Sequence, residues 1–352
     1  MKVNQSVIGR MLLGLLVFSF ACAVPISGQG QDSGSFYKGK TITFLVSVGP
    51  GGGFDLYARM IAPFLEKETG ATVVVQNMPG GEGYIALRHL QTAKPDGLSI
   101  IIFSGGKATL NQLFGDARAK GMDIKKFAWL SGVVKEPCIL MLSKKLPYRS
   151  LNDLKAAKQT ITSGTAGSLS NQHLAFAFLG EVAGIDTKII PGFSGSAEQS
   201  LGAMRGELSA FMISEGSALE FSRQPELFPL LTVSMSRAKL FPNLPALPEL
   251  VTLTPDQVKW IQRMENILTI ERSILGTPGI PADRVQFLRG ALKRVMTNKE
   301  FLAVAEKNQR LVGNIPGEEV EKIMLDILNM PANESKEFKR ILNAHIMKSM
   351  SK

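Results

Sequence analysis

Two glycine-rich loops constrain the fold of this chain more than any other feature. The first is Gly49-Pro50-Gly51-Gly52-Gly53-Phe54-Asp55, and the second is Asn77-Met78-Pro79-Gly80-Gly81-Glu82-Gly83. Each loop follows an apolar β-type run and opens a helical stretch. Such units in tandem favour a buried parallel sheet with right-handed crossovers, which binds ligands beyond the carboxyl ends of its strands. We therefore expect an α/β fold with both loops at that edge.

These loops also predict an anion site. The unpaired N–H groups and the positive dipole end of a helix attract negative charge, and glycine lets the backbone approach a ligand without a Cβ in the way. A receptor for a small anion is the first interpretation. Asp55 admits two roles: it orients the loop and the helix N-terminus, which we favour, or it pairs with a ligand ammonium.

Apolar periodicity predicts two α/β units followed by helices. Strands of the first unit are expected at 41–48, 72–75 and 98–103. The second unit has expected strands at 139–143, 160–163, 187–190, 209–213 and 230–233, with helices at 171–182 and 197–205. From Pro255 onward helices are expected at 256–264, 282–296, 299–307, 318–328 and 334–347. A length of 352 residues suits two domains.

The N-terminus has the pattern of a secretory signal. Lys2 and Arg10 supply positive charge, an apolar run follows, and Ala21-Cys22-Ala23 is a cleavage-type sequence. We expect residues 1–23 to be a cleaved signal peptide, residues 24–39 to be a flexible leader, and the mature protein to reside in the periplasm. Lipidation at Cys22 is a less favoured alternative, because the usual leucine three positions upstream is missing.

Composition excludes several classes of protein. Cleavage after Ala23 leaves one cysteine, Cys138, so that no intramolecular disulfide forms, and the thiol reads as a buried, inert side chain. The net charge of +10 comes from dispersed lysines and arginines. Because no dense basic run exists, we expect no nucleic-acid partner.

Cofactor and catalytic motifs are weak. Gly81-x-Gly83-x-x-Ala86 formally fits a dinucleotide fingerprint, but residues 100–104 lack the acidic residue that it requires. The sequence has no G-x-S-x-G elbow. None of the three histidines belongs to a cluster with metal-ligand spacing: His89, His173 and His345. We predict no cofactor, no metal and no catalytic residues, although an unrelated Ser/His/Asp arrangement stays open.

With these motifs assembled, the chain resembles the substrate-binding receptors of tripartite tricarboxylate transporters, the Bug or tricarboxylate-receptor family. The resemblance covers most of the mature chain. It lies in both glycine loops together with four further segments, namely Ala58-Arg59, Pro95-Asp96-Gly97, Leu151-Asn152-Asp153-Leu154-Lys155 and Gly279-Ile280-Pro281-Ala282-Asp283-Arg284-Val285. Two segments depart from the family pattern, residues 191–196 and 208–209.

The resemblance implies a two-domain periplasmic-binding-protein-like fold that closes like a flytrap. Each domain would be a mostly parallel sheet flanked by helices, with domain 1 at 40–137 plus 266–352 and domain 2 at 138–265. The C-terminal helices would return to domain 1. Loops of both domains would bind a carboxylate, which nominates Gly49, Pro50, Gly51, Gly52, Gly53, Asp55, Asn77, Pro79, Gly80, Gly81, Gly83, Gly164, Thr165, Ala166, Ser168, Ser194, Gly195 and Ser196. For the loop at 163–168, helix capping is an equally good interpretation.

We therefore expect a monomeric extracytoplasmic receptor that captures a small organic carboxylate and delivers it to membrane transporter subunits, without covalent chemistry. Two alternatives stay open: a receptor of a signalling system, and a periplasmic enzyme acting on a carboxylate. The sequence does not name the ligand, so that citrate, other di- and tricarboxylates, amino dicarboxylates and aromatic carboxylates remain candidates.

Overall fold

The computed structural model describes residues 33–165, 167–193 and 195–345. The predicted signal peptide and most of the predicted leader lie outside the described residues, as do Ala166 and Ser194. Within the described residues, no helix has both the length and the apolar character that crossing a membrane requires.

Both glycine loops follow strands of the first sheet, at the carboxyl ends of those strands. The strand order of this sheet is β11-β4-β10-β3-β1-β2. β1 pairs in parallel with β2 and β3, whereas β10 is antiparallel to β3 and β4, and β11 is antiparallel to β4. Consequently β1 to β4 share one direction, and β10 and β11 run against them. The strands are β1 (Thr41–Val46), β2 (Thr72–Asn77), β3 (Ser99–Phe103), β4 (Ala128–Gly132), β10 (Ser273–Gly276) and β11 (Ile315–Pro316).

The second sheet has the order β7-β6-β8-β5-β9. β6 is parallel to β7 and β8, and β5 is antiparallel to β8 and β9. Only β5 therefore runs against the other strands of this sheet. The strands are β5 (Cys138–Ser143), β6 (Ile161–Thr165), β7 (Thr187–Pro191), β8 (Ala210–Ser214) and β9 (Leu227–Val233). The predicted α/β fold is confirmed; both sheets are mixed, and most strands of each share one direction.

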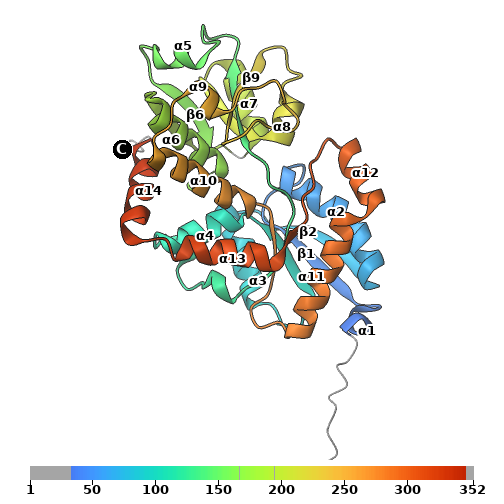
Figure 1. The fold of residues 1–352 in the computed structure, drawn as a ribbon. Coiled ribbons are helices and arrows are strands. Elements are labelled where there is room, and N and C mark those ends of the chain that lie inside the picture. The colour runs from blue at the N-terminus through green and yellow to red at the C-terminus, as the bar shows by residue number, and fades with distance from the viewer. Residues whose placement is uncertain (1–32, 166, 194, 346–352) are drawn as a thin grey trace, which may run out of the picture. The chain divides into compact units, whose positions relative to one another are not determined.

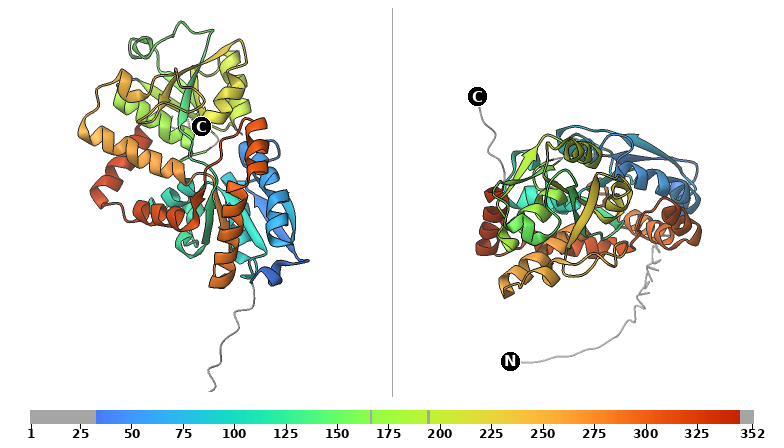
Figure 2. Two further views of the ribbon diagram at one scale, coloured as in Figure 1. Left: turned by 45° about the vertical axis from the view of Figure 1, so that its right-hand side comes forward. Right: turned by 90° about the horizontal axis from the view of Figure 1, so that it is seen from above.

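Helices flank both sheets (Figures 1 and 2). The helix α2 ends before Gly70, which adopts a left-handed conformation (φ 68°) and donates its N–H to the Glu66 carbonyl. The helices are α1 (Ser33–Tyr37), α2 (Gly53–Thr69), α3 (Tyr84–Thr92), α4 (Gly105–Leu113), α5 (Leu151–Lys155), α6 (Asn171–Ala183), α7 (Ser196–Arg205), α8 (Glu215–Phe221), α9 (Leu247–Leu250), α10 (Pro255–Thr269), α11 (Ala282–Thr297), α12 (Lys299–Lys307), α13 (Gly317–Leu328) and α14 (Ala332–Ala344).

Two short segments cross between the sheets and lead directly into a strand. Residues 133–137 lead from β4 into β5, and residues 270–272 lead from α10 into β10. Both segments therefore enter a reversed strand in the interior of a sheet. Both sheets are covered on their two faces, since β3 and β5 are almost wholly buried. Cys138 is buried at the start of β5, as the sequence predicts, and burial raises the pKa of its thiol to about 12.

The C-terminal helices divide between the two sheets. α11 contacts α2 and β4, and α13 contacts β4 and α4. α14 instead packs on α6, where the rings of Phe338 and Phe178 lie 4.9 Å apart. The carbonyl of His345 accepts the Ile189 N–H of the edge strand β7 at 2.8 Å. The helix α14 thus contacts elements of the second sheet, and the assignment of all of residues 266–352 to domain 1 stays a prediction.

Candidate functional site

Asp55 holds the first glycine loop in place. Its buried carboxylate accepts hydrogen bonds from the Gly51 N–H at 2.9 Å, the Asn77 amide at 2.9 Å and the Arg59 guanidinium at 3.0 Å. Burial alone would raise the pKa of Asp55, but the hydrogen bonds from Arg59, Gly51 and Asn77 outweigh burial and hold the pKa below its usual value. This geometry fits loop orientation, the role that we favour from the sequence.

The same network ties the two glycine loops together. The Asn77 amide also donates to the carbonyl of Val48 at 3.0 Å, and its oxygen accepts from Arg59 at 2.8 Å. Asn77 ends β2, whereas Val48 follows β1. Because β1 and β2 are parallel neighbours, their carboxyl ends meet, and the loops that leave them lie side by side.

The structure separates glycines that the fold needs from glycines that it does not. Gly83 has φ +92°, and a Cβ there would lie 2.9 Å from the Phe103 ring. Gly49 and Gly52 lack a positive φ; a Cβ at Gly49 would meet no atom within 4 Å, and one at Gly52 only ordinary contacts. The fold therefore has room for a Cβ at Gly49 and Gly52. Glycine at these two positions fits the close approach of a ligand.

The loop after β6 is held mainly by its own contacts. The Thr165 hydroxyl lies 2.8 Å from both the Gly167 carbonyl and the Ser170 hydroxyl. A Cβ at Gly164 would collide with the Phe193 ring at 2.7 Å. These contacts favour the helix-capping interpretation of this loop. The Thr165 hydroxyl bonds to groups of the loop itself, and Gly164 is a glycine because the Phe193 ring leaves no room for a Cβ.

The loop after β7 leads into α7 beside the β6 loop. The Phe193 N–H donates to the Thr165 carbonyl at 3.3 Å. Gly195 immediately precedes α7, Ser196 begins it, and a Cβ at Gly195 would meet no atom within 4 Å. Among the nominated residues of these two loops, Gly195 is the clearest example of an open backbone position at a helix N-terminus.

The second glycine loop meets the second sheet directly. The Glu82 carboxylate lies against Gly167, where a Cβ would overlap it. Arg118 donates to the Ser168 hydroxyl at 2.5 Å and also pairs with Glu82. Each of the four nominated loops thus contacts the next one: the first glycine loop contacts the second, the second contacts the β6 loop, and the β6 loop contacts the β7 loop. The structure brings together the described members of the predicted set, but no ligand contact by any of them is tested, so that their role stays a prediction.

Three charged side chains at this edge were not predicted. Lys107, on the first turn of α4, donates to the Glu82 carbonyl at 3.0 Å, and burial lowers the pKa of its ammonium. Arg118 is bonded to Asp116 at 2.7 Å as well as to Glu82 and Ser168. The signal for Lys107 is present in the sequence: Ser104-Gly105-Gly106-Lys107 is a third strand–glycine–helix junction, although it is not a P-loop.

Arg272 is the third such side chain, and it lies on a connecting segment. Its guanidinium stacks on the rings of Tyr57 and Phe54, with centroid distances of 5.2 and 5.7 Å, and pairs with Glu136 at 2.5 Å. It also lies 3.3 Å from the position of a Cβ on Gly53. A buried cation therefore stands beside the start of α2, next to the first glycine loop.

Glu271, the neighbour of Arg272, joins both sheets through helix N-termini. Ser104, the N-cap of α4, donates its hydroxyl to the Glu271 carboxylate. With its amide nitrogen turned toward Glu271, Asn171 at the start of α6 donates to both carboxylate oxygens at 2.7 and 3.1 Å. Burial raises the pKa of Glu271. The segment 270–272 is therefore anchored to both sides of the connection.

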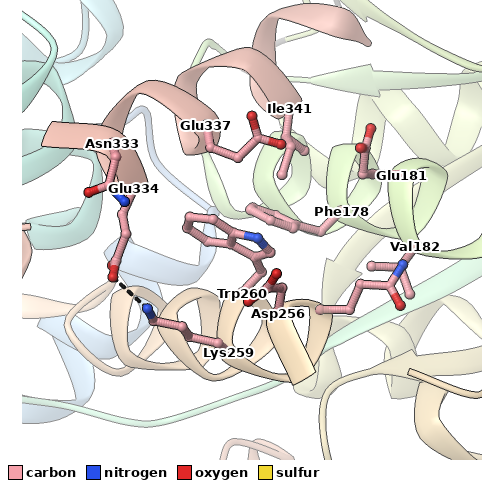
Figure 3. A pocket seen from close by; sticks show the side chains of 11 residues that line it. Phe178, Glu181, Val182, Asp256, Lys259, Trp260, Asn333, Glu334, Glu337 and Ile341 are labelled. Atoms are coloured by element: carbon pink, nitrogen blue, oxygen red, sulfur yellow. Dashed lines mark hydrogen bonds and ion pairs between the residues drawn. The ribbon is translucent and has the colours of Figure 1, made fainter. Parts of the chain in front are cut away.

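A cavity of about 430 Å³ lies elsewhere, among α6, α10 and α14 (Figure 3). Trp260 and Phe178 supply its aromatic surface. Several of its charged groups pair with one another or with adjacent arginines: Glu334 lies 2.5 Å from Lys259, and Glu181 lies 2.5 Å from Arg340. None of the nominated loop residues lines this cavity. In the part of the chain that the structure describes, no group of histidines, cysteines and carboxylates is arranged to hold a metal ion.

The chain matches the family described as "Tripartite tricarboxylate transporter family receptor" over residues 57–328, which is more than half of its length. The first glycine loop precedes the matched range. A curated relative, the protein BugT of Bordetella pertussis, is 26% identical over 243 residues, which cover 68% of this chain and 72% of BugT.

Solved structures share the fold. The R. palustris protein Rpa4515, solved with adipate, superposes with a TM-score of 0.70 at 19% identity, over 88% of this chain and 99% of that protein. MatC from Rhodopseudomonas palustris, solved with malate, gives a TM-score of 0.69 at 17% identity, over 86% of this chain and 99% of MatC. The periplasmic binding protein BugD gives 0.69 at 20% identity, over 88% of this chain and all of BugD.

Proposed function

Because the chain belongs to the tripartite tricarboxylate transporter receptor family, whose members are solute receptors, we propose that it captures a small organic carboxylate between the glycine loops of the first sheet and the loops of the second. It then delivers this ligand to a membrane transporter. Two structural neighbours were solved with adipate and malate, both carboxylates, which supports this ligand class.

One observation carries the proposal. Gly49 and Gly52 leave open space near the N-terminus of α2, where the fold would accommodate a Cβ, and the largely buried guanidinium of Arg272 lies beside Gly53 at the start of that helix. Free backbone N–H groups, a helix dipole and a nearby guanidinium are the features that recognise a carboxylate. The loops from the second sheet would complete the site when the two sheets approach one another around the ligand.

The receptor acts in the periplasm as a monomer. A cleaved signal at residues 1–23 would export it, and lipidation at Cys22 is the competing outcome. Mass spectrometry of the mature protein, purified from the envelope fraction, distinguishes a new N-terminus after Ala23 from a lipid-modified Cys22.

The protein works as a receptor rather than as an enzyme. His173 is buried, with both ring nitrogens engaged by backbone groups, and His345 is bonded to Thr187 at 2.6 Å. His89 is exposed on α3. In these environments none of the three histidines is placed to act as a general base toward a bound carboxylate. Unchanged recovery of ligand after long incubation with the protein supports the receptor role, whereas a new product would contradict it.

The direct test is a thermal-shift and calorimetry screen of the mature protein against carboxylates, after unfolding and refolding to remove any ligand that co-purified. A ligand at about 100 times its Kd adds roughly 2.7 kcal/mol of stability. A response confined to one carboxylate class is expected. A flat response across the panel from refolded protein would overturn the ligand class. Loss of uptake of the same labelled ligand in a deletion strain tests transport against a signalling role.

A further inference from the structure

Glu82 has an unusual backbone at the centre of the second glycine loop. It adopts φ +55° and ψ +31°, a left-handed conformation that few residues other than glycine use. Gly80, Gly81 and Gly83, its neighbours in the loop, also have positive φ values. The Glu82 carbonyl accepts the Lys107 ammonium at 3.0 Å. The direction of the Glu82 side chain is thus fixed by its own backbone and by a buried cation.

The Glu82 carboxylate points to the second sheet and lies between two cations. One oxygen forms an ion pair with Arg118, and the other lies 3.7 Å from the Lys107 ammonium. This second oxygen is buried, and among the described residues it has no hydrogen-bond donor. It lies over Gly167, at a position that any Cβ would fill. The carboxylate therefore occupies the junction of loops from both sheets.

This junction has the chemistry of a carboxylate subsite. Lys107 is only 12% exposed, and Arg118 is 29% exposed, so that both cations are partly removed from water. Two converging cations favour a carboxylate, and Arg118 can bind one with two parallel hydrogen bonds. Here the carboxylate comes from the chain itself. Glu82 and Asp116 together balance the two positive charges of Lys107 and Arg118.

We propose that Glu82 is a built-in carboxylate that fills the Lys107–Arg118 subsite and thereby restricts the receptor to ligands with a single carboxylate. This inference rests on the proposed function. The ligand carboxylate binds at the first glycine loop, and the opposite end of the ligand faces Glu82. A second carboxylate at that end would lie beside a like charge and would find both cations already paired.

The test compares ligands that differ only in a second carboxylate, namely butyrate with succinate, hexanoate with adipate, and benzoate with terephthalate. Affinities are measured by calorimetry for the wild type, Glu82→Gly and Glu82→Gln. Glycine suits the left-handed backbone, so that Glu82→Gly removes the side chain without straining the loop. Glu318→Gln, at an exposed ion pair on α13, is the control for an equal change of charge.

In the wild type, we expect the monocarboxylate of at least one pair to bind about tenfold or more tightly than its partner. Glu82→Gly should raise the affinity for the dicarboxylate of that pair by about tenfold or more, and Glu318→Gln should not. Adding Lys107→Met to Glu82→Gly should remove the gain.

A wild type that binds the dicarboxylate as tightly as Glu82→Gly does would overturn the inference and leave the proposed function intact. Folded wild-type protein and folded variants that all ignore every carboxylate would overturn the proposed function itself. The two failures are therefore distinguishable.

Discussion

The Arg272 guanidinium and the Glu136 carboxylate lie 2.5 Å apart, buried, on the two segments that connect the sheets. Glu136 belongs to the segment that enters β5, and Arg272 precedes β10. The side chains of Arg272 and Glu136 are only 11% and 2% exposed. Each of the two connecting segments thus contributes one member of this ion pair. The pair holds the segments together where the chain crosses between the sheets.

Removing one member of this pair should destabilise the protein strongly. Glu136→Ala leaves a buried guanidinium without its counter-ion, and such a change costs about 3–5 kcal/mol. We expect that loss in the free energy of unfolding measured with urea at pH 7. The double variant Glu136→Ala, Arg272→Met should be more stable than Glu136→Ala alone. A single variant as stable as the wild type would show that the pair does not hold the connection.

Substitution of Gly52 should separate binding from folding. A Cβ at Gly52 would lie 3.6 Å from the Val48 side chain, an ordinary contact, so Gly52→Val should cost only about 1 kcal/mol of stability, because valine is a poorer helix N-cap than glycine. The valine would occupy space at the helix N-terminus, so that carboxylate affinity should fall at least about tenfold, or ~1.4 kcal/mol. Calorimetry and urea unfolding check the two halves of this prediction.

Gly83→Val is the contrasting variant. Gly83 has φ +92° and lies against Phe103, so this variant should lose roughly 1–3 kcal/mol of stability or more. If Gly52→Val binds ligand normally, the assignment of the first loop to the site is wrong.

Acid should destabilise the packing of α14 through His173. The buried ring accepts the Leu169 N–H at Nδ1, and its Nε2 donates to the Leu342 carbonyl of α14 at 3.1 Å. Burial lowers the pKa of His173 to about 4, so the folded protein keeps the ring neutral while the unfolded chain binds a proton below pH 6.5. The stabilisation is full above about pH 6.5 and is lost as the pH falls toward 4, by about 3 kcal/mol.

The measurement is the free energy of unfolding between pH 7 and pH 4 for the wild type and His173→Gln. We expect a shallower pH dependence in His173→Gln. His89→Gln alters an exposed histidine and should keep the wild-type slope. Equal slopes in all three proteins would contradict the role of His173.

Loss of Asp55 should loosen the first glycine loop. Asp55→Ala removes the acceptor for Gly51, Arg59 and Asn77, at a cost of about 1–3 kcal/mol. The pKa of Asp55 is lowered in the fold, so its contribution is present above its ordinary pKa and fades as the pH falls through the lowered value. The stability gap between the wild type and Asp55→Ala should therefore be wide at pH 7 and should narrow progressively as the pH falls below 3.8, the ordinary pKa of aspartate, as read by urea unfolding.

Much of the fold could be predicted because its elements carry strong local signals. The helix α12 begins and ends at Lys299 and Lys307 as predicted, and β1 and β3 differ from prediction only at their ends. The strand β10 was not predicted, since four residues are too few to show a period. Tertiary pairing with β3 and β4, rather than local sequence, makes this segment a strand.

The helix α4 escaped prediction for another reason. Gly105 and Gly106 are poor helix formers, yet both stand in its first turn. A Cβ at Gly105 would lie 2.5 Å from the Ile270 carbonyl, and one at Gly106 would lie 2.7 Å from the Ile267 side chain. Close packing against the end of α10 requires glycine at both positions. The same packing places Lys107, the next residue of α4, at the candidate site.

The glycine loops of the candidate site could be predicted from the sequence, but the contacts of the charged side chains around them could not. Glycine, proline and asparagine signal a turn by themselves, so that residues 49–55 and 77–83 stand out in the sequence. Arg272 reaches the first loop from more than two hundred residues away, and Glu82 meets Gly167 only through the approach of the two sheets. Contacts of this kind depend on the assembled fold, and no local pattern encodes them.

The edge strand β7 is covered by the residue that follows α14, since the Ile189 N–H donates to the His345 carbonyl. An uncovered strand edge is a template on which another chain can add itself. Shortening the protein before His345 would leave that backbone donor without its acceptor. Recombinant proteins truncated in this way would self-associate more readily on storage. An affinity tag should therefore follow the intact C-terminal segment and should not replace it.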